Sequence, residues 1–357
     1  MKSKNAFTII SLHHNLRPAP APVGCALGSE RIDNQKILVS RVGIETGRKC
    51  NLRCIYCFAN SGEPLSHELT TPELFHLIDE AYEAGAQIIP IIGGGEPTLN
   101  KDLLEIVAYI ARKGMIPGVF TNGILMTEQT AARLFDLGAY VVGKLNSLDH
   151  DIEDFMTGVK GASRRIKRGI HILEEAGFAR AIPSRLSINT IICKYNYDEI
   201  PTIFRWLRDR NIIPYMQLPV VTGRATAEIT VSNEKAKNLF YRIRDIDRCD
   251  YGYDWIPIPP NVGWSCTQRT TSCYVTSSGF VQLCNSTNVQ FGNIREQTLR
   301  DILLSPRMQA VRDINRVHGN CAQCPYLGVY CCAGCTANTL CTTGDIFASD
   351  DRCWHTW

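Results

Sequence analysis

The amino-acid sequence predicts an α/β fold: a partial (β/α)6 TIM-like barrel followed by a small cysteine-rich domain with a β-hairpin. Two observations predict it. Between Val42 and Leu218, short apolar runs alternate with longer amphipathic runs, which is typical of βα units around a parallel sheet. From Cys266 onward the cysteines become dense and this alternation ends.

Each element follows from its local pattern. The expected strands are Val42–Thr46, Gln87–Ile92, Ile116–Thr121, Tyr140–Leu145, Arg185–Cys193 and Ile213–Leu218. The expected helices between them include Thr71–Glu83, Lys101–Lys113, Glu128–Leu137, Ala162–Glu175 and Asp198–Arg210. After the barrel, a helix is expected from Ser232, its cap, to about Asp247. Ser277-Ser278-Gly279 is expected to form the turn of a hairpin.

These patterns divide the chain into four parts. Residues 1–40 are expected to form a lead-in arm with a proline-rich linker, and residues 41–225 the barrel. Residues 226–262 are expected to form a connector helix and an aromatic and proline-rich linker, and residues 263–357 the cysteine-rich domain.

Composition narrows the class of protein. A chain of 357 residues with 45% apolar residues can bury a large core. No apolar run approaches the roughly 20 residues of a membrane helix, and a net charge of +3 without a Lys/Arg run does not indicate a nucleic-acid partner. The 16 cysteines are clustered, as metal ligands are, and ligation needs reduced thiolates. We therefore expect a cytoplasmic protein.

Three cysteines follow the first expected strand as C-x3-C-x2-C, at Cys50, Cys54 and Cys57. A [4Fe-4S] cluster bound by three thiolates keeps one iron open to another ligand. A structural zinc site is an alternative, although such sites normally close with four ligands. A chance cluster of cysteines is the other alternative.

This loop resembles the signature of the radical S-adenosylmethionine (SAM) superfamily. The resemblance implies that the open iron binds the amino and carboxylate groups of SAM and donates the electron that cleaves it. The product would be a 5′-deoxyadenosyl radical, which abstracts hydrogen from carbon. It also implies that Tyr56, just before the third cysteine, lies against the adenine. The same resemblance implies the partial barrel.

Further polar positions follow the strands, and ligands gather at the carboxyl ends of parallel strands. After the second strand come Gly93, Gly94, Gly95, Glu96 and Pro97, where a backbone without side chains lets a ligand approach. In the resembled family this segment holds the SAM amino group. Similar candidates for SAM binding at later strand ends are Thr121, Asn122, Lys144, Ser147 and Asn189. Ordinary turn chemistry or a satisfied barrel interior is the alternative for these later positions.

The carboxyl-terminal cysteines resemble the SPASM extension of radical SAM enzymes. The resemblance implies two auxiliary [4Fe-4S] clusters, and therefore three in all. One would be bound by Cys266, Cys273, Cys284 and Cys335, and the other by Cys321, Cys324, Cys331 and Cys353. Eight thiolates would close both sites, which favours electron transfer or a structural role. The spacing before Cys331 departs from the family pattern by one residue, so Cys332 is an alternative ligand. A zinc ribbon is the other alternative, although ten cysteines exceed its needs.

The resemblance leaves the substrate open. We expect hydrogen abstraction from a natural-product intermediate (a sugar, aminocyclitol or nucleoside) leading to dehydrogenation, epimerisation or elimination, because the arm before the barrel is shorter than a leader-binding domain. The alternative is a maturase that installs a cross-link, epimerisation or oxidation in a ribosomally made precursor peptide. A non-catalytic iron–sulfur electron carrier is a third hypothesis, but it would not need an open iron. A flavodoxin- or ferredoxin-type electron donor is the expected partner.

Five cysteines remain once three clusters are assigned. A thiol near the substrate can quench a carbon radical, and Cys249, in the connector, is the candidate catalytic hydrogen donor. The alternative for Cys249 is a small buried hydrophobic residue. Unassigned cysteines are Cys25, Cys193, Cys332 and Cys341.

Overall fold

A computed structural model describes residues 31–32, 35–36 and 38–355. Most of the expected arm, and with it Cys25, lies outside the described residues. Within the arm, strands β1 (Arg31–Ile32) and β2 (Gln35–Lys36) pair antiparallel. Among the described residues, no helix is both long enough and apolar enough to span a membrane.

A single nine-stranded sheet organises the described part of the chain, in the order β11-β10-β9-β3-β4-β5-β6-β7-β8. Its parallel barrel strands are β3 (Arg41–Ile44), β4 (Ile88–Ile91), β5 (Ile116–Phe120), β6 (Tyr140–Lys144), β7 (Leu186–Ile191) and β8 (Ile213–Gln217). Each lies within two residues of its predicted bounds. The predicted partial barrel is confirmed.

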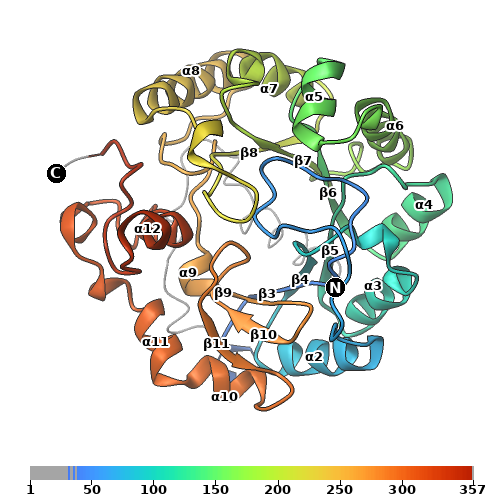
Figure 1. Cartoon of the computed structure of the whole chain (residues 1–357), viewed down its shortest axis with the longest axis vertical. Helices are drawn as coiled ribbons and strands as arrows, with labels where there is room; N and C mark the ends of the chain where they lie inside the picture. Colours follow the sequence, from blue (N-terminus) through green and yellow to red (C-terminus); the bar gives the residue numbers. More distant parts are fainter. Residues whose placement is uncertain (1–30, 33–34, 37, 356–357) are drawn as a thin grey trace.

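Helices cover the outside of these strands, as Figure 1 shows. They are α2 (Thr71–Glu83), α3 (Leu103–Arg112), α4 (Glu128–Asp136), α5 (His150–Thr157), α6 (Ala162–Glu175), α7 (Ile200–Arg208) and α8 (Asn233–Tyr251). Helix α2 illustrates why they form: Thr70 and Glu73 make a capping box, and Leu74, Leu77, Ile78 and Ala81 give it one buried face. Ser232 caps α8, as predicted.

The carboxyl-terminal region completes the circle on the side opposite α3 to α6 (Figure 1). Its elements are α9 (Gln268–Thr271), β9 (Ser272–Val275), β10 (Phe280–Gln282), β11 (Gln290–Asn293), α10 (Leu299–Leu304), α11 (Pro306–Arg312) and α12 (Thr336–Thr343). The short 3-10 helices are η1 (Pro97–Leu99), η2 (Tyr197–Glu199), η3 (Ala227–Ile229), η4 (Ile314–Arg316) and η5 (Gly319–Gln323).

The predicted hairpin is confirmed, since β9 and β10 pair antiparallel around a turn that contains Gly279 in the left-handed conformation (φ 84°). Strand β9 also pairs in parallel with β3. The cysteine-rich region therefore extends the barrel sheet, a pairing that the sequence did not predict.

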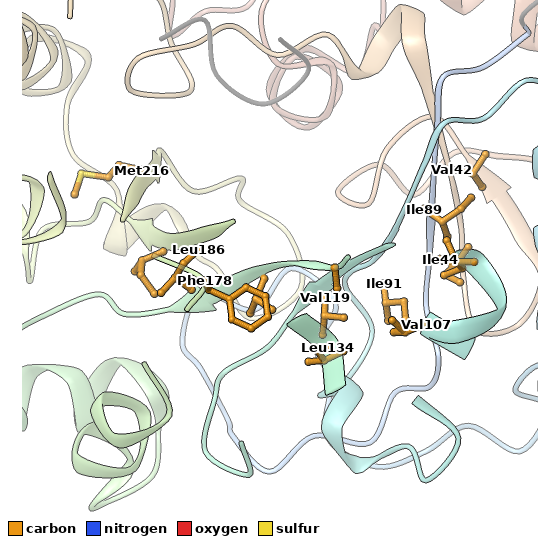
Figure 2. Close-up of a cluster of buried hydrophobic side chains, with 14 of the residues drawn as sticks. Val42, Ile44, Ile89, Ile91, Val107, Val119, Leu134, Phe178, Leu186 and Met216 are labelled. Atoms are coloured by element: carbon orange, nitrogen blue, oxygen red, sulfur yellow. The ribbon is translucent and has the colours of Figure 1, made fainter. Parts of the chain in front are cut away.

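The main core lies between the outer face of the sheet and its helices. Figure 2 shows Val42 and Ile44 from β3, Ile91 from β4, Val119 from β5 and Leu134 from α4 converging there. All of them are almost completely buried. Each such side chain contributes about 1.5–3 kcal/mol through burial, so the outer face stabilises the barrel and leaves the inner face free for a site.

Glu45, directly after β3, joins the barrel to the hairpin. Its buried carboxylate accepts hydrogen bonds from Tyr274 Oη (2.5 Å) and the backbone N–H of Ser277 (2.8 Å). Arg48 forms an ion pair with the same carboxylate at 3.1 Å. A buried carboxylate needs such partners, so Glu45 holds the segment before the cysteine loop against β9.

We expect Tyr274→Phe to lower the free energy of unfolding by about 1.5–3 kcal/mol, the usual contribution of a hydrogen bond to a charged group. Urea unfolding of the metal-free chain, followed by circular dichroism, measures it. Tyr82→Phe, at an exposed position of α2, is the matched control. Equal stability of Tyr274→Phe and wild type would contradict the role assigned to Glu45.

Candidate active site

One cavity of about 240 Å³ lies at the carboxyl ends of the barrel strands. Residues that follow β4 and β5 line it, together with the last residues of β6 and β8. Cys50, Cys54 and Cys57 line it as well. The cavity also extends to Cys266, Cys284 and Cys335 in the carboxyl-terminal region, so it joins the two groups of cysteines.

The loop with the first three cysteines is closed by its own backbone. The N–H of Cys50 donates to Gly62 O (2.9 Å), and the N–H of Gly62 donates to Arg48 O (3.1 Å). Burial raises the pKa of Cys54 to about 12 and also raises that of Cys50. Without a metal these thiols keep their protons. They become thiolates when a metal cation binds and displaces the proton.

Arg224, which the sequence analysis did not single out, supports this loop from outside. Its Nε donates to Cys54 O (2.9 Å), its backbone N–H donates to Cys57 O (2.9 Å), and its guanidinium also donates to Ser61 O (2.9 Å). Gly223 adopts a left-handed conformation (φ 63°), and a side chain there would overlap the carbonyl of Phe58. Gly223-Arg224 thus holds the cysteine loop.

The glycines after β4 pack directly on the start of the cysteine loop. Gly95 N–H donates to Gly47 O (2.6 Å), and Glu96 N–H donates to Lys49 O (2.9 Å). A side chain at Gly95 would overlap the carbonyl of Lys49, and one at Gly93 would overlap Tyr274 Oη. The glycines line the cavity, as expected. They are also required by packing within the protein, because side chains at these positions would overlap neighbouring atoms.

Glu96 connects the ends of β4 and β5. Its buried carboxylate accepts hydrogen bonds from Thr98 N–H (3.1 Å) and Thr98 Oγ1 (2.6 Å). It also accepts from Thr121 Oγ1 (2.6 Å) and Asn122 N–H (2.7 Å). Burial raises the pKa of Glu96, and these bonds oppose that rise. Glu96, Thr121 and Asn122 all line the cavity, so these predicted residues are brought together.

Lys144, Tyr56 and Asn189 form a second group in the cavity. Lys144 Nζ lies 4.6 Å from the centroid of the Tyr56 ring and donates to Asn189 Oδ1 (2.5 Å). Burial lowers the pKa of Lys144 to about 8. Tyr56 Oη accepts a hydrogen bond from Asn146 Nδ2 (2.9 Å). Lys144, the last residue of β6, therefore lies over Tyr56 and is bonded to Asn189 of β7.

Two predicted SAM-binding residues do not line the cavity. Ser147 is buried, and its hydroxyl donates to Glu199. Pro97 is the buried first residue of η1. Both positions follow strands, but the chain turns there, so their side chains serve the turns that hold Lys144 and Glu96 in place.

Glu153 of α5 is a buried acid that the sequence did not reveal. Its carboxylate accepts the N–H groups of Asn146 and Ser147, both at 2.8 Å. Burial raises its pKa to about 7. Because Asn146 also contacts Tyr56, Glu153 positions the end of β6 beside the cysteine loop.

A separate small cavity contains the second predicted auxiliary group. Cys321, Cys324, Cys331 and Cys353 all line it. Cys332, the alternative to Cys331, is fully buried and does not line it. Among the described residues, no three His, Cys, Asp or Glu side chains are close enough to hold a single metal ion. A multi-iron cluster spaces its ligands more widely than a single ion does.

Other predicted positions lie away from both cavities. Cys249 was expected in a linker, but α8 continues to Tyr251 and ends at Gly252 in the left-handed conformation. Cys249 is therefore on an exposed helix face and is not among the cavity residues, so the structure does not bring it to the site. Cys273 is buried outside the cavity, Cys193 packs beside Tyr56, and Cys341 is exposed.

Several cavity residues have no counterpart in the sequence prediction, and they are Phe120, Tyr215, Gln217, Arg224, Trp264 and Arg269. Gln217 ends β8 and could have been found by the strand-end rule. The two arginines carried no such signal, because their places depend on contacts between distant parts of the chain.

A half-open barrel with cysteines and a glycine turn at the carboxyl ends of its strands defines an iron–sulfur protein with a ligand site in the barrel. Comparison with protein families agrees: the radical SAM superfamily matches residues 44–207, and SPASM, an iron-sulfur cluster-binding domain, matches residues 266–325. The chain belongs to the radical SAM superfamily and carries a carboxyl-terminal SPASM extension.

Relatives of different kinds align over most of the chain. An AdoMet-dependent heme synthase of Methanosarcina barkeri is 28% identical over 85% of this chain and 93% of its own length. A PqqA peptide cyclase of Granulibacter bethesdensis is 26% identical over 87% of this chain and 85% of its own.

Solved structures share the fold. Streptococcus suis SuiB bound to the precursor peptide SuiA superposes with a TM-score of 0.71 at 18% identity, over 90% of this chain and 77% of that chain. The enzyme anSMEcpe with bound AdoMet and Cp18Cys peptide gives 0.67 at 15% identity, over 87% and 93%. At these identities the likeness concerns the fold.

Membership implies SAM, a [4Fe-4S] cluster that binds it and auxiliary clusters as cofactors. The described residues fit the first cluster, because three thiols line a cavity that also contains the glycine turn. They fit the Cys321 group equally well, with four cysteines around one small cavity.

We expect Gly95→Ala to displace the loop before Cys50 and to lower iron content by about four atoms per chain, one [4Fe-4S] cluster. Iron analysis after anaerobic reconstitution measures this. Gly114→Ala is the control: Gly114 has a positive φ (81°), which Gly95 does not have, but no atom lies within 4 Å of an added Cβ. Full iron content in Gly95→Ala would contradict the packing role.

Glu153 predicts a pH dependence of stability. The pKa of Glu153 is about 7 in the folded chain and near 4.5 in the unfolded chain, so the folded chain binds the proton more tightly. This difference stabilises the folded chain fully below pH 4.5, and the stabilisation is lost as pH rises through 7. Between pH 5 and 8, wild type should lose about 2–3 kcal/mol relative to Glu153→Gln. Urea unfolding of the metal-free chain tests this, with Glu83→Gln, at an exposed position, as control. Parallel pH profiles for wild type and Glu153→Gln would refute it.

Proposed function

We propose that the protein is a radical SAM maturase that modifies a side chain of a ribosomally made peptide. The observation that carries the proposal is one cavity that extends from the SAM-binding loop to auxiliary cysteines and that Phe120, Tyr215 and Trp264 also line. Related PqqA peptide cyclases are named for a peptide substrate, which adds support.

We propose that the predicted residues hold SAM at the barrel mouth. The backbone of Gly93–Gly95 approaches the ligand, Glu96 accepts from its amino group, and Lys144 attracts its carboxylate. Tyr56 is fixed by Lys144 and Asn146, which orients its ring for the adenine. SAM bound at the cluster supplies a 5′-deoxyadenosyl radical that abstracts hydrogen from the substrate.

Three aromatic side chains line the same cavity and form an aromatic wall. The ring centroids of Phe120 and Tyr215 are 6.4 Å apart, and those of Tyr215 and Trp264 are 5.1 Å apart. Such rings exclude water and bind apolar or planar groups. We propose that they surround the reacting side chain of the peptide.

The charges of the cavity disfavour an aminocyclitol. Among the described residues lining the cavity, Glu96 is the only carboxylate, and four donors already bond to it. Lys144, Arg224 and Arg269 are cationic. The amines of an aminocyclitol would meet cations, and the one carboxylate is already assigned to the SAM amino group. The wider small-molecule hypothesis, which came first on sequence alone, now ranks behind the peptide because the relatives include peptide cyclases.

A second candidate substrate is an iron porphyrin. Relatives named AdoMet-dependent heme synthase and Fe-coproporphyrin III synthase align over 85% and 87% of this chain. A flat ring with carboxylates would also suit the aromatic wall and the arginines of the cavity. A flavodoxin- or ferredoxin-type electron donor and a cytoplasmic location stay predictions for either substrate.

We expect a precursor peptide encoded beside the gene to stimulate 5′-deoxyadenosine formation by the anaerobically reconstituted protein with SAM and dithionite. The peptide should also change in mass or, in D2O, gain deuterium at one residue. Liquid chromatography with mass spectrometry measures both, with heat-inactivated protein and a scrambled peptide as controls. Stimulation and conversion by iron-coproporphyrin III in place of the peptide would refute the peptide proposal in favour of the second candidate.

A further inference from the structure

The first auxiliary group is incomplete where the cavity meets it. Three of its four predicted ligands, Cys266, Cys284 and Cys335, line the main cavity. Both Cys266 and Cys284 lie close enough to Cys335 for its charge to affect them. The fourth predicted ligand, Cys273, does not line the cavity.

Strand geometry explains the position of Cys273. In the parallel pair β3–β9, Cys273 is opposite Val42, and Tyr274 is opposite Gly43. Side chains alternate between the two faces of a strand, and paired residues share a face. Val42 points into the outer core (Figure 2), so Cys273 lies on that outer face as well.

Tyr274 marks the opposite, inner face. The hydroxyl of Tyr274 donates a hydrogen bond to Glu45. A side chain at Gly93, which lines the cavity, would overlap the same hydroxyl. Cys273 is 1% exposed within the hydrophobic core, and the charged group near it is Arg312 of α11. A rotamer change cannot bring a side chain through a β-strand, so Cys273 is held away from the other three cysteines.

No other strong ligand replaces it among the described residues. Apart from the cysteines of the two groups, the described lining contains no cysteine and no histidine. Its only carboxylate is the Glu96 side chain already bonded by four donors. The part of the chain that the structure describes therefore offers three thiolates, not four, to this cluster.

Arg269 gives this corner of the cavity an unusual charge. It is 2% exposed, and the thiols near it belong to both auxiliary groups: Cys321 and Cys331 of the second, and Cys266 and Cys284 of the first. Its guanidinium donates to Thr336 Oγ1, Val311 O and Ile346 O, all neutral acceptors, and no ion pair involves it among the described residues. A buried cation without a carboxylate partner attracts an anion into the cavity.

We propose that the auxiliary cluster held by Cys266, Cys284 and Cys335 has one iron without a protein thiolate, and that this iron binds a carboxylate of the substrate beside Arg269. The proposal rests on the auxiliary cluster of the proposed function, but its three tests measure the cluster itself and need no substrate. A carboxylate anchored there would fix the substrate at the far end of the cavity from SAM.

The ligand set is tested by iron analysis and electron paramagnetic resonance of the reconstituted full chain. Cys273→Ala should keep wild-type iron content and the auxiliary signal, whereas Cys284→Ala should lose about four irons. Loss of the same irons in Cys273→Ala, with circular dichroism showing a folded chain, would overturn the proposal.

The open iron is tested without altering Cys273. A variant with Cys50, Cys54 and Cys57 all replaced by alanine keeps only the auxiliary clusters. Cyanide labelled with 13C should give it a 13C hyperfine coupling in electron–nuclear double resonance, and the further change Cys284→Ala should abolish the coupling. An auxiliary signal without any 13C coupling would show a closed cluster and overturn the proposal, whichever substrate the enzyme takes.

The carboxylate is tested in the same variant without cyanide. Acetate labelled with 13C in its carboxyl group should give a 13C coupling, Arg269→Gln should raise the acetate concentration required, and Arg269→Lys should restore part of the effect. Absence of any coupling from acetate in a variant that binds cyanide would leave the iron open but overturn the carboxylate assignment.

Discussion

The close approach of two backbones supports the whole site. Gly95 and Glu96 donate hydrogen bonds to the segment Gly47–Lys49, directly before Cys50, and no side chain fits between them. The glycine turn after β4 and the cysteine loop after β3 therefore have one fixed relative position. Glu45 ties the same segment to β9 through Tyr274 and Ser277. Because β9 belongs to the carboxyl-terminal region, the barrel and the auxiliary cysteines are held by the same few contacts.

Three cations in the cavity wall, of which Arg269 is buried, balance charge within this frame. Arg224 binds the carbonyl groups of the cysteine loop, Lys144 lies over Tyr56, and Arg269 lies near Cys266 and Cys284. Burial raises the pKa of Cys54 and Cys266 to about 12, so the metal-free thiols are neutral. Cluster binding replaces those protons, and the cations then offset the negative charge that thiolate ligands bring. Fold, cysteine chemistry and ligand charge are therefore coupled in one cavity.

The sequence predicted what depends on local pattern. Six barrel strands lie within two residues of their expected bounds, since apolar alternation and strand length are local properties. The spacing of Cys50, Cys54 and Cys57 identified the family, which the family models confirm. What spacing does not encode is the face of a strand: the resemblance to SPASM grouped Cys273 with Cys266, yet β9 turns Cys273 to the outer core. Likewise Cys249 lies on α8 because that helix ends later than predicted, and Arg224 and Arg269 act through contacts between distant segments.

The central claim is that one cavity has a SAM-binding cluster site at one end and a three-cysteine auxiliary site at the other. Anomalous diffraction at the iron edge, from an anaerobically grown crystal of the SAM-loaded protein, measures it most directly. The account predicts iron density bonded to Cys50, Cys54 and Cys57, and separate density bonded to Cys266, Cys284 and Cys335 with Cys273 still in the core. Iron bonded to Cys273, or no iron density at the wall formed by Cys266, Cys284 and Cys335, would contradict it.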